Sequence, residues 1–240
     1  MNEWFETWFD SKYYHLLYQD RNEVEAKQFI EKICTYITPS SEQHILDLAC
    51  GKGRHSVYLN KTGAFVDGCD YSTNSIEYAR QFENEKLHFY KHDMRSELPK
   101  SYHYIFNLFT SFGYFETIEE HEQTLTHIYN GLHTDGLFIF DYMNAAHAID
   151  HLTPQETIFK GEIQFHIRRQ LIHQKLIKSI SFQDQGVSYQ HQEKVTAFFP
   201  DQLIQMMRNC GFTLLEKFGN YNLDSFDLQS SKRLILILQK

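Results

Sequence analysis

The sequence lacks the features of a secreted or membrane-bound protein. Its four cysteines, Cys34, Cys50, Cys69 and Cys210, are widely spaced and form no CxxC pair, so they fit reduced thiols better than a disulfide framework. No apolar run approaches the roughly 20 residues of a membrane-spanning helix. The first residues carry acids early and lack the basic start of a secretion signal. We therefore expect a cytoplasmic protein without a membrane partner.

Positive charge is also scarce. The chain has 23 Lys and Arg against 31 Asp and Glu, which gives a formal net charge of -8, and no basic run is longer than the pairs Arg168-Arg169 and Lys232-Arg233. A surface of this sign repels phosphate backbones, which disfavours a nucleic-acid partner. With 240 residues, 42% of them hydrophobic, one core can form without disulfides or structural metal. We expect one domain over residues 1–240 and leave its oligomeric state open.

Helical and strand-like segments follow one another along the chain. Residues 3–37 have apolar residues at helical spacing and predict one or two helices. Strands are then expected over 44–49, 64–70, 87–91, 104–109, 136–142, 212–218 and 233–238, and helices over 54–59, 73–82, 117–129 and 200–210. Such alternation is typical of parallel strands joined by right-handed helical crossovers. The pattern predicts a doubly wound α/β fold with a mostly parallel seven-stranded sheet and helices on both faces.

A different texture separates the fifth and sixth of these strands. Between residues 151 and 199 short runs of alternating polarity recur with little helical periodicity. We expect this stretch to form a small inserted antiparallel β cap.

A glycine turn and an acid stand where doubly wound folds bind ligands. Asp47 lies in the first expected strand, and Gly51 and Gly53 follow that strand, so that backbone amides can approach an anion or carboxylate closely. Asp70 comes 19 positions after Gly51, at the end of the second strand, where an acid reaches ribose hydroxyls. Each acid could instead cap a turn or a helix, but their joint spacing favours ligand roles.

These residues resemble the first motif of the class I S-adenosylmethionine-dependent methyltransferases, which are Rossmann-like. The resemblance implies that Asp47, Gly51 and Gly53 bind the methionine part of the cofactor, with Arg54 near its carboxylate. Ala49 stands where the family most often has glycine, which matters only if that backbone needs a positive φ.

Three later segments are similar to further motifs of the family, in order and at strand ends. Asp70-Tyr71-Ser72 resembles the second, which implies that Asp70 binds the ribose and Tyr71 packs on the adenine. In His92-Asp93-Met94, Asp93 would accept from the adenine amino group and the Met94 amide would donate to the ring. Asn107-Leu108 would lie beside the transferred methyl group.

The resemblance also bears on the acceptor. Asn107-Leu108-Phe109-Thr110 replaces the Asn-Pro-Pro-Tyr tetrad of enzymes that methylate nucleobase amino groups, and the next residues resemble small-molecule members. In such members an N-terminal segment, here residues 1–38, and inserted strands, here 151–199, form a lid over the substrate. We therefore expect S-adenosylmethionine as cofactor and a small-molecule methyl acceptor.

No catalytic residue is singled out, because methyl transfer from a sulfonium depends mainly on alignment. His15, Tyr18, His55 and Tyr142 are candidates for a base if the acceptor needs one. The histidines form no metal-binding pattern, so no metal is expected. The aromatic residues near the N-terminus are expected mainly to pack against the sheet; they are Trp4, Phe5, Trp8, Tyr13, Tyr14 and Tyr18.

Two alternatives stay open at this stage. A nicotinamide-dependent oxidoreductase would also use the glycines and Asp70, although its fingerprint wants a small residue where Arg54 stands. The other alternative is a regulatory protein that binds S-adenosylmethionine without catalysis.

Overall fold

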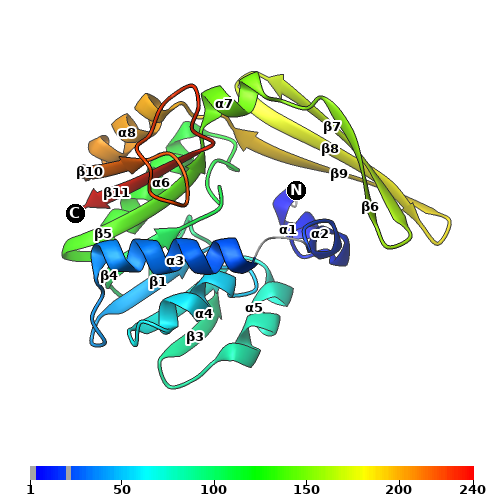
Figure 1. Cartoon of the computed structure of the whole chain (residues 1–240). Helices are drawn as coiled ribbons and strands as arrows, with labels where there is room; N and C mark the ends of the chain where they lie inside the picture. Colours follow the sequence, from blue (N-terminus) through cyan, green and yellow to red (C-terminus); the bar gives the residue numbers. More distant parts are fainter. Residues whose placement is uncertain (1–3, 20–22) are drawn as a thin grey trace.

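The computed structural model describes residues 4–19 and 23–240, which fold around two separate sheets (Figure 1). The large sheet has the order β10-β11-β5-β4-β1-β2-β3, and all its neighbours are parallel except at β11, which runs antiparallel to β5 and β10. Its strands are β1 (His44–Leu48), β2 (Phe65–Asp70), β3 (Leu87–Lys91), β4 (Tyr102–Asn107), β5 (Leu132–Met143), β10 (Thr213–Phe218) and β11 (Arg233–Gln239). The predicted seven-stranded, mostly parallel sheet is confirmed.

Helices cover both faces of the large sheet (Figure 1). One face carries α3 (Glu23–Ile37), α4 (Arg54–Asn60), α5 (Thr73–Ala79) and the short 3-10 helix η1 (Arg80–Phe82), and the other carries α6 (Ile118–Asn130) and α8 (Pro200–Asn209). The apolar stripe of α3, which includes Phe29 and Ile33, packs with Ile45 of β1. Strand β11 is buried from Leu234 to Leu238, as its continuous apolar run predicts for a strand covered on both faces.

The inserted cap is a four-stranded antiparallel sheet that projects from the end of β5 (Figure 1). It follows α7 (Ala145–Asp150) and consists of β6 (Gln155–Lys160), β7 (Ile163–Ile172), β8 (Lys175–Asp184) and β9 (Val187–Thr196). Alternate residues of these strands face opposite sides, and Phe165, Ile167, Ile180 and Phe182 form an apolar inner face. The antiparallel insertion expected from alternating polarity is confirmed.

Two short helices, α1 (Trp4–Trp8) and α2 (Lys12–Leu17), lie against this inner face rather than on the large sheet (Figure 1). The indole of Trp8 donates to Glu193 of β9 at 2.8 Å, and the Tyr18 hydroxyl donates to the same carboxylate at 2.8 Å. The N-terminal segment therefore contains three helices where the sequence suggested one or two. The apolar stripe of α3 faces the large sheet, so the lid consists of residues 4–18, which include α1 and α2.

In the described ranges 4–19 and 23–240, no helix combines the length and the apolar character needed to cross a lipid bilayer.

Candidate functional site

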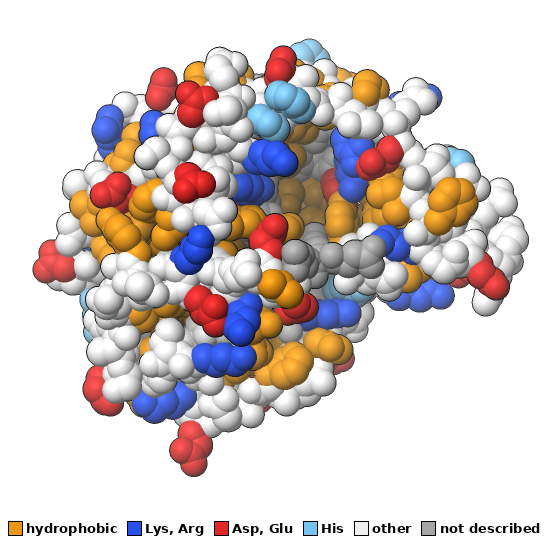
Figure 2. Space-filling view, in the orientation of Figure 1, with side chains coloured by type: hydrophobic (Ala, Val, Ile, Leu, Met, Phe, Trp, Pro, Cys, Tyr) orange, Lys and Arg blue, Asp and Glu red, His pale blue; other side chains and the backbone are white. Residues whose placement is uncertain are grey.

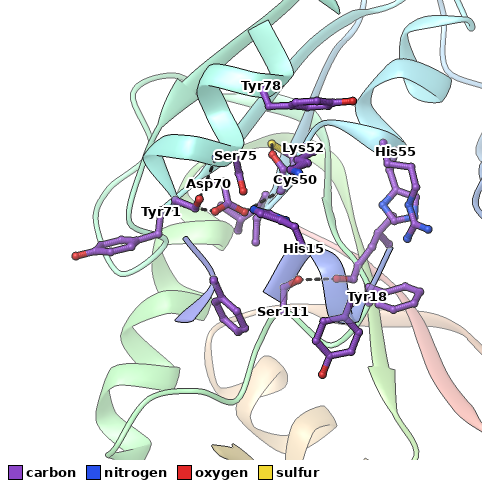
Figure 3. Close-up of a pocket in the computed structure, with 18 of the residues that line it drawn as sticks. His15, Tyr18, Cys50, Lys52, His55, Asp70, Tyr71, Ser75, Tyr78 and Ser111 are labelled. Atoms are coloured by element: carbon purple, nitrogen blue, oxygen red, sulfur yellow. Dashed lines mark hydrogen bonds between the residues drawn. The ribbon is translucent and has the colours of Figure 1, made fainter. Parts of the chain in front are cut away.

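A cavity of about 690 Å³ opens where β1, β2, β3 and β4 end, and the lid lies over it (Figure 3). Open parallel sheets bind their ligands at these carboxyl ends. The cavity is lined by the glycine turn after β1, by the residues that follow the other three strands, and by α1 and α2. Figure 2 shows that the molecule is hollowed between the large sheet and the cap, with hydrophobic side chains inside and Lys and Arg side chains near the rim.

Eight of the eleven residues expected to bind the cofactor line this cavity. They are Ala49, Gly51, Arg54, Asp70, Tyr71, Asp93, Met94 and Leu108. The other three, Asp47, Gly53 and Asn107, lie behind the cavity wall, where each supports the turn or the strands that form it.

The turn after β1 reverses the chain through positive φ angles at Ala49 (64°), Gly51 (55°) and Gly53 (80°). A Cβ at Gly51 would meet no atom of the described residues within 4 Å, so this backbone faces open space. A Cβ at Gly53 would lie 2.7 Å from the Phe89 ring, so that glycine is required for packing α4 on the sheet. The departure at Ala49 falls at a position that does need a positive φ, at a cost of about 1 to 2 kcal/mol for a residue with a Cβ.

Asp47 is buried, at 1% exposure, and accepts a hydrogen bond from the Ser56 hydroxyl of α4 at 2.6 Å. This contact joins β1 to α4 across the turn, so Asp47 shapes the turn from behind. Burial raises the pKa of Asp47 to about 6, and the Ser56 contact only partly opposes that shift.

The raised pKa of Asp47 gives a stability prediction. Its carboxyl binds a proton more readily in the folded chain than in the unfolded chain, where the pKa is about 3.9. The charge of Asp47 therefore lowers the free energy of unfolding as the pH rises through this interval, by roughly 2 to 3 kcal/mol in all. Asp47→Asn removes this titration, so its free energy of unfolding relative to the wild type should rise by that amount from about pH 4 to about pH 7. Denaturant unfolding of both proteins across this range tests the effect, and a pH-independent difference would contradict it.

Asp70 lies at the end of β2, and each of its carboxylate oxygens accepts one backbone amide. The amide of Gly51 donates to Oδ2 and the amide of Ser72 donates to Oδ1, both at 2.8 Å. Burial raises the pKa of Asp70, although these amides oppose the shift. A carboxylate has about four acceptor sites, so both oxygens can still accept from adjacent hydroxyls. Asp70 thus ties the glycine turn to the second strand and keeps acceptor capacity for a diol.

Beyond Asp70, the cavity wall has an aromatic part, which includes Tyr71 and Phe5, and a charged part, which includes Asp93. The Tyr71 ring lies edge-on to Phe5 of the lid at 5.9 Å. Asp93 lines the cavity, but its carboxylate binds Arg95, with Nη2 to Oδ2 at 2.7 Å. Burial works to raise the pKa of Asp93, and the contacts from Arg95 outweigh it, so the pKa is lowered. Asp93 is therefore a charged acceptor whose orientation Arg95 sets.

At the end of β4, the residues after Asn107 line the cavity and Asn107 itself does not. Asn107 is buried and donates from Nδ2 to the carbonyl of Leu48 at 3.0 Å, which ties β4 to β1. Leu108 and Phe109 line the cavity beyond it. Phe109 and Thr110 both have positive φ, 63° and 60°. Such strain costs about 1 to 3 kcal/mol for each residue and clusters at functional sites.

Three of the four candidates for a base line the cavity. Figure 3 shows His15 projecting from the lid toward Asp70, with His55 at the opposite end. The Tyr18 hydroxyl is engaged by Glu193 and by the Lys178 ammonium of the cap. Tyr142 does not reach the cavity: it is fully buried, and its hydroxyl donates to the carbonyl of Thr196.

The aromatic residues of the N-terminal segment divide between two roles. Phe5, Tyr14 and Tyr18 line the cavity, whereas Trp8 and Tyr13 pack into the cap. The expectation that they pack on the large sheet was wrong, because the cap supplies a second apolar face. Among the described residues no group of three or more His, Cys, Asp or Glu could bind a metal ion.

Other cavity residues were given no role by the sequence analysis. They are mainly Phe9, Lys52, Ser72, Ser75, Tyr78, His92, Ser111, Tyr114 and Phe115. Lys52 and His92 lie next to recognised motif residues, which is a usable signal. Tyr114 follows a strand by several positions and meets Phe9 of the lid at 5.4 Å between ring centroids, a contact that no local pattern announces.

Comparisons with known proteins agree with this geometry. The family model described as "Methyltransferase domain" matches residues 39–198. A Geobacillus sp. protein with a provisional name as a methyltransferase is 25% identical over 228 residues, which cover 89% of this chain and 91% of that protein.

Two solved structures show the same fold. An S-adenosylmethionine-dependent methyltransferase from Clostridium acetobutylicum has a TM-score of 0.79 at 17% identity, with 95% of each chain covered. The sugar N-methyltransferase KedS8 from Streptoalloteichus sp. has a TM-score of 0.72 at 13% identity, with 92% of this chain and 89% of that chain covered.

Proposed function

The chain belongs to the methyltransferase domain family, and we propose that it transfers a methyl group from S-adenosylmethionine to an amine group of a small molecule. The observation that carries this proposal is the cradle formed by Asp70 and the glycine turn. Asp70 accepts the Gly51 amide at 2.8 Å, and the space beside Gly51 is open to the cavity. A carboxylate that can accept hydrogen bonds from two adjacent hydroxyls, next to an exposed backbone turn, fits a nucleoside with a short amino-acid arm.

The cavity residues divide according to the parts of that ligand. Asp70 would bind the two ribose hydroxyls, and Ala49, Gly51 and Arg54 would surround the amino-acid arm. On the adenine side, Tyr71 would pack on the ring, with Asp93 and the Met94 amide at its edge. Asp47, Gly53 and Asn107 would act from behind the wall by fixing the turn and the ends of β1 and β4.

S-adenosylmethionine supplies an activated methyl group whose leaving group is a neutral thioether, so the protein needs mainly to align the acceptor and exclude water. The lid serves the second need. Its Phe9 ring contacts Tyr14 at 4.9 Å and Tyr114 at 5.4 Å between centroids, which places an aromatic wall across the cavity. His15 and His55 are two of the cavity side chains that could accept a proton after transfer.

Several observations support a small amine as the acceptor. The structural neighbour KedS8 is described as a sugar N-methyltransferase. A neutral amine can lose its proton after transfer and needs no dedicated base. The net charge of -8 disfavours a nucleic acid as the acceptor.

We also propose that the protein is cytoplasmic, which the four free thiols support.

We expect the lid to open when ligands enter, and Asp10 is among the residues that fasten it to the cofactor side. The Asp10 carboxylate, between α1 and α2, accepts from the Ser72 hydroxyl at 2.6 Å, from the Asn74 backbone amide at 2.9 Å and from the Asn74 side-chain amide at 2.8 Å. We expect Asp10→Ala to release S-adenosylhomocysteine at least about fivefold faster, because it removes three hydrogen bonds and each is worth about 1 kcal/mol. Stopped-flow dissociation measures this rate.

The matched control for the lid is Asp184→Ala, which removes the Tyr13 contact at 2.7 Å between α2 and the cap. It leaves the fastening at Ser72 intact, so the release rate should stay near that of the wild type. Equal rates in Asp10→Ala and the wild type would refute the role of Asp10.

Calorimetric titration with S-adenosylhomocysteine, and separately with reduced nicotinamide dinucleotides, tests the proposed cofactor without a known acceptor. Saturable binding of S-adenosylhomocysteine alone is expected, and nicotinamide binding alone would favour an oxidoreductase. Turnover with a panel of amines, alcohols and carbon acids then tests the acceptor class. Binding without turnover of any acceptor would favour a regulatory protein instead.

A further inference from the structure

A buried network outside the cavity lies behind its strained segment. Phe109 and Thr110 have consecutive positive φ angles and neither is glycine. Backbone of this kind persists only where its surroundings over-determine it. The groups that fix these two residues are therefore part of the construction of the site.

Asp141 of β5 is the centre of that network and is 1% exposed. Its Oδ2 accepts the Phe109 amide at 2.8 Å, and its main-chain carbonyl accepts the Thr110 amide at 3.0 Å. Arg233 donates from Nε to Oδ1 at 2.8 Å and from Nη2 to the Thr110 hydroxyl at 3.0 Å. The Tyr221 hydroxyl donates to Oδ2 at 3.0 Å. Both strained residues are thus bound by groups from β5, β11 and the loop before β11.

The network reaches the cavity through the Phe109 ring. The Arg54 guanidinium carbon lies 5.2 Å from the ring centroid and the Arg233 guanidinium carbon lies 5.8 Å from it. Tyr221 stacks on the same ring at 6.4 Å with an interplanar angle of 18°. Because a guanidinium stacks on an aromatic face in a preferred geometry, a shift of Phe109 would also shift Arg54, which lines the cavity.

We propose that Asp141, Arg233 and Tyr221 form a positioning network that fixes Phe109 and, through its ring, orients Arg54 toward the carboxylate of the cofactor's amino-acid arm. This inference rests on the proposed function, which supplies the ligand. None of the three residues lines the cavity, so they are positioning residues and not catalytic ones. The strained backbone is the link between the network and the ligand.

Asp141→Asn tests the network with little change in shape. An amide group has only one acceptor oxygen, so its NH₂ must face either the Phe109 amide and the Tyr221 hydroxyl or the Arg233 guanidinium, and donor then meets donor. We expect S-adenosylhomocysteine to bind about tenfold more weakly. The shift of Phe109 would weaken the charge-assisted contact between Arg54 and the carboxylate of the ligand. 5′-Methylthioadenosine lacks the amino-acid arm, so its affinity should change by less than about twofold.

The matched control is Ile139→Val, a buried change on the same strand that lowers stability without touching the network. It should leave the ratio of the two affinities unchanged. A purely structural role of Asp141 would lower stability, as Ile139→Val does, without changing this ratio.

The outcomes separate the two hypotheses. If the wild type binds neither ligand, the proposed function fails. If the wild type binds both and Asp141→Asn weakens both equally or neither, the positioning network is refuted while the proposed function stands. Should Asp141→Asn not fold, Arg233→Lys keeps the charge but loses the fork, and an unchanged affinity ratio in that variant would refute the network in the same way.

Discussion

Asp70→Ala should weaken the binding of S-adenosylhomocysteine by about 1 to 3 kcal/mol, or roughly 5- to 150-fold. The variant removes the half-buried carboxylate that is proposed to accept hydrogen bonds from both ribose hydroxyls. The two hydroxyls are then left without a partner. It also frees the Gly51 amide, which donates to Oδ2 at 2.8 Å, so the glycine turn loses its tie to β2. Calorimetric titration of the variant beside the wild type measures the loss.

The matched control for Asp70 is Asp67→Ala on the same strand. Asp67 accepts from the Tyr102 hydroxyl at 2.9 Å and pairs with Lys100 at 2.7 Å, and it does not line the cavity. This control should lose stability but bind S-adenosylhomocysteine within about twofold of the wild type. Equal losses of affinity in both variants would mean that Asp70 acts through stability, and unchanged affinity in Asp70→Ala would move the ribose site elsewhere.

The sequence predicts the large sheet well because its signals are local. Alternating strands and helices, the glycines after β1 and the acid at the end of β2 are each recognised from a few neighbouring residues, and the topology then brings the strand ends together. This is why Gly51, Asp70 and Asp93, which come from three different strand ends, line one cavity.

The lid could not be read in the same way, because its partners are distant in the sequence. The aromatic stripe of α1 and α2 could pack on any apolar face. It packs on the cap and not on the large sheet partly because Glu193 and Lys178 of the cap, more than 150 positions away, bind its polar groups. The role of Asp141 was equally hidden. It looks like any acid at a strand end until Arg233 and the strained residues Phe109 and Thr110 are placed around it.

Gly51→Ala and Gly53→Ala should fail in opposite ways although the two positions are only two residues apart. At Gly53 a new Cβ would lie 2.7 Å from the Phe89 ring and 3.3 Å from the Ala79 Cβ. Overpacking combined with the positive φ of 80° should lower the free energy of unfolding by about 2 to 4 kcal/mol. At Gly51 the same Cβ meets no described atom within 4 Å, so only the backbone penalty of about 1 kcal/mol applies.

Ligand affinity should show the reverse order. The Cβ at Gly51 would project into the space proposed for the amino-acid arm, so binding of S-adenosylhomocysteine should fall more than about tenfold. In folded Gly53→Ala, measured well below its melting temperature, the affinity should fall less, because Gly53 does not line the cavity. Denaturant unfolding and calorimetry on both variants separate the two effects. If Gly51→Ala kept its affinity, the open space beside Gly51 would not be the cofactor site, and the fit between the glycine turn and the ligand would have to be abandoned even if Gly53→Ala unfolded as expected.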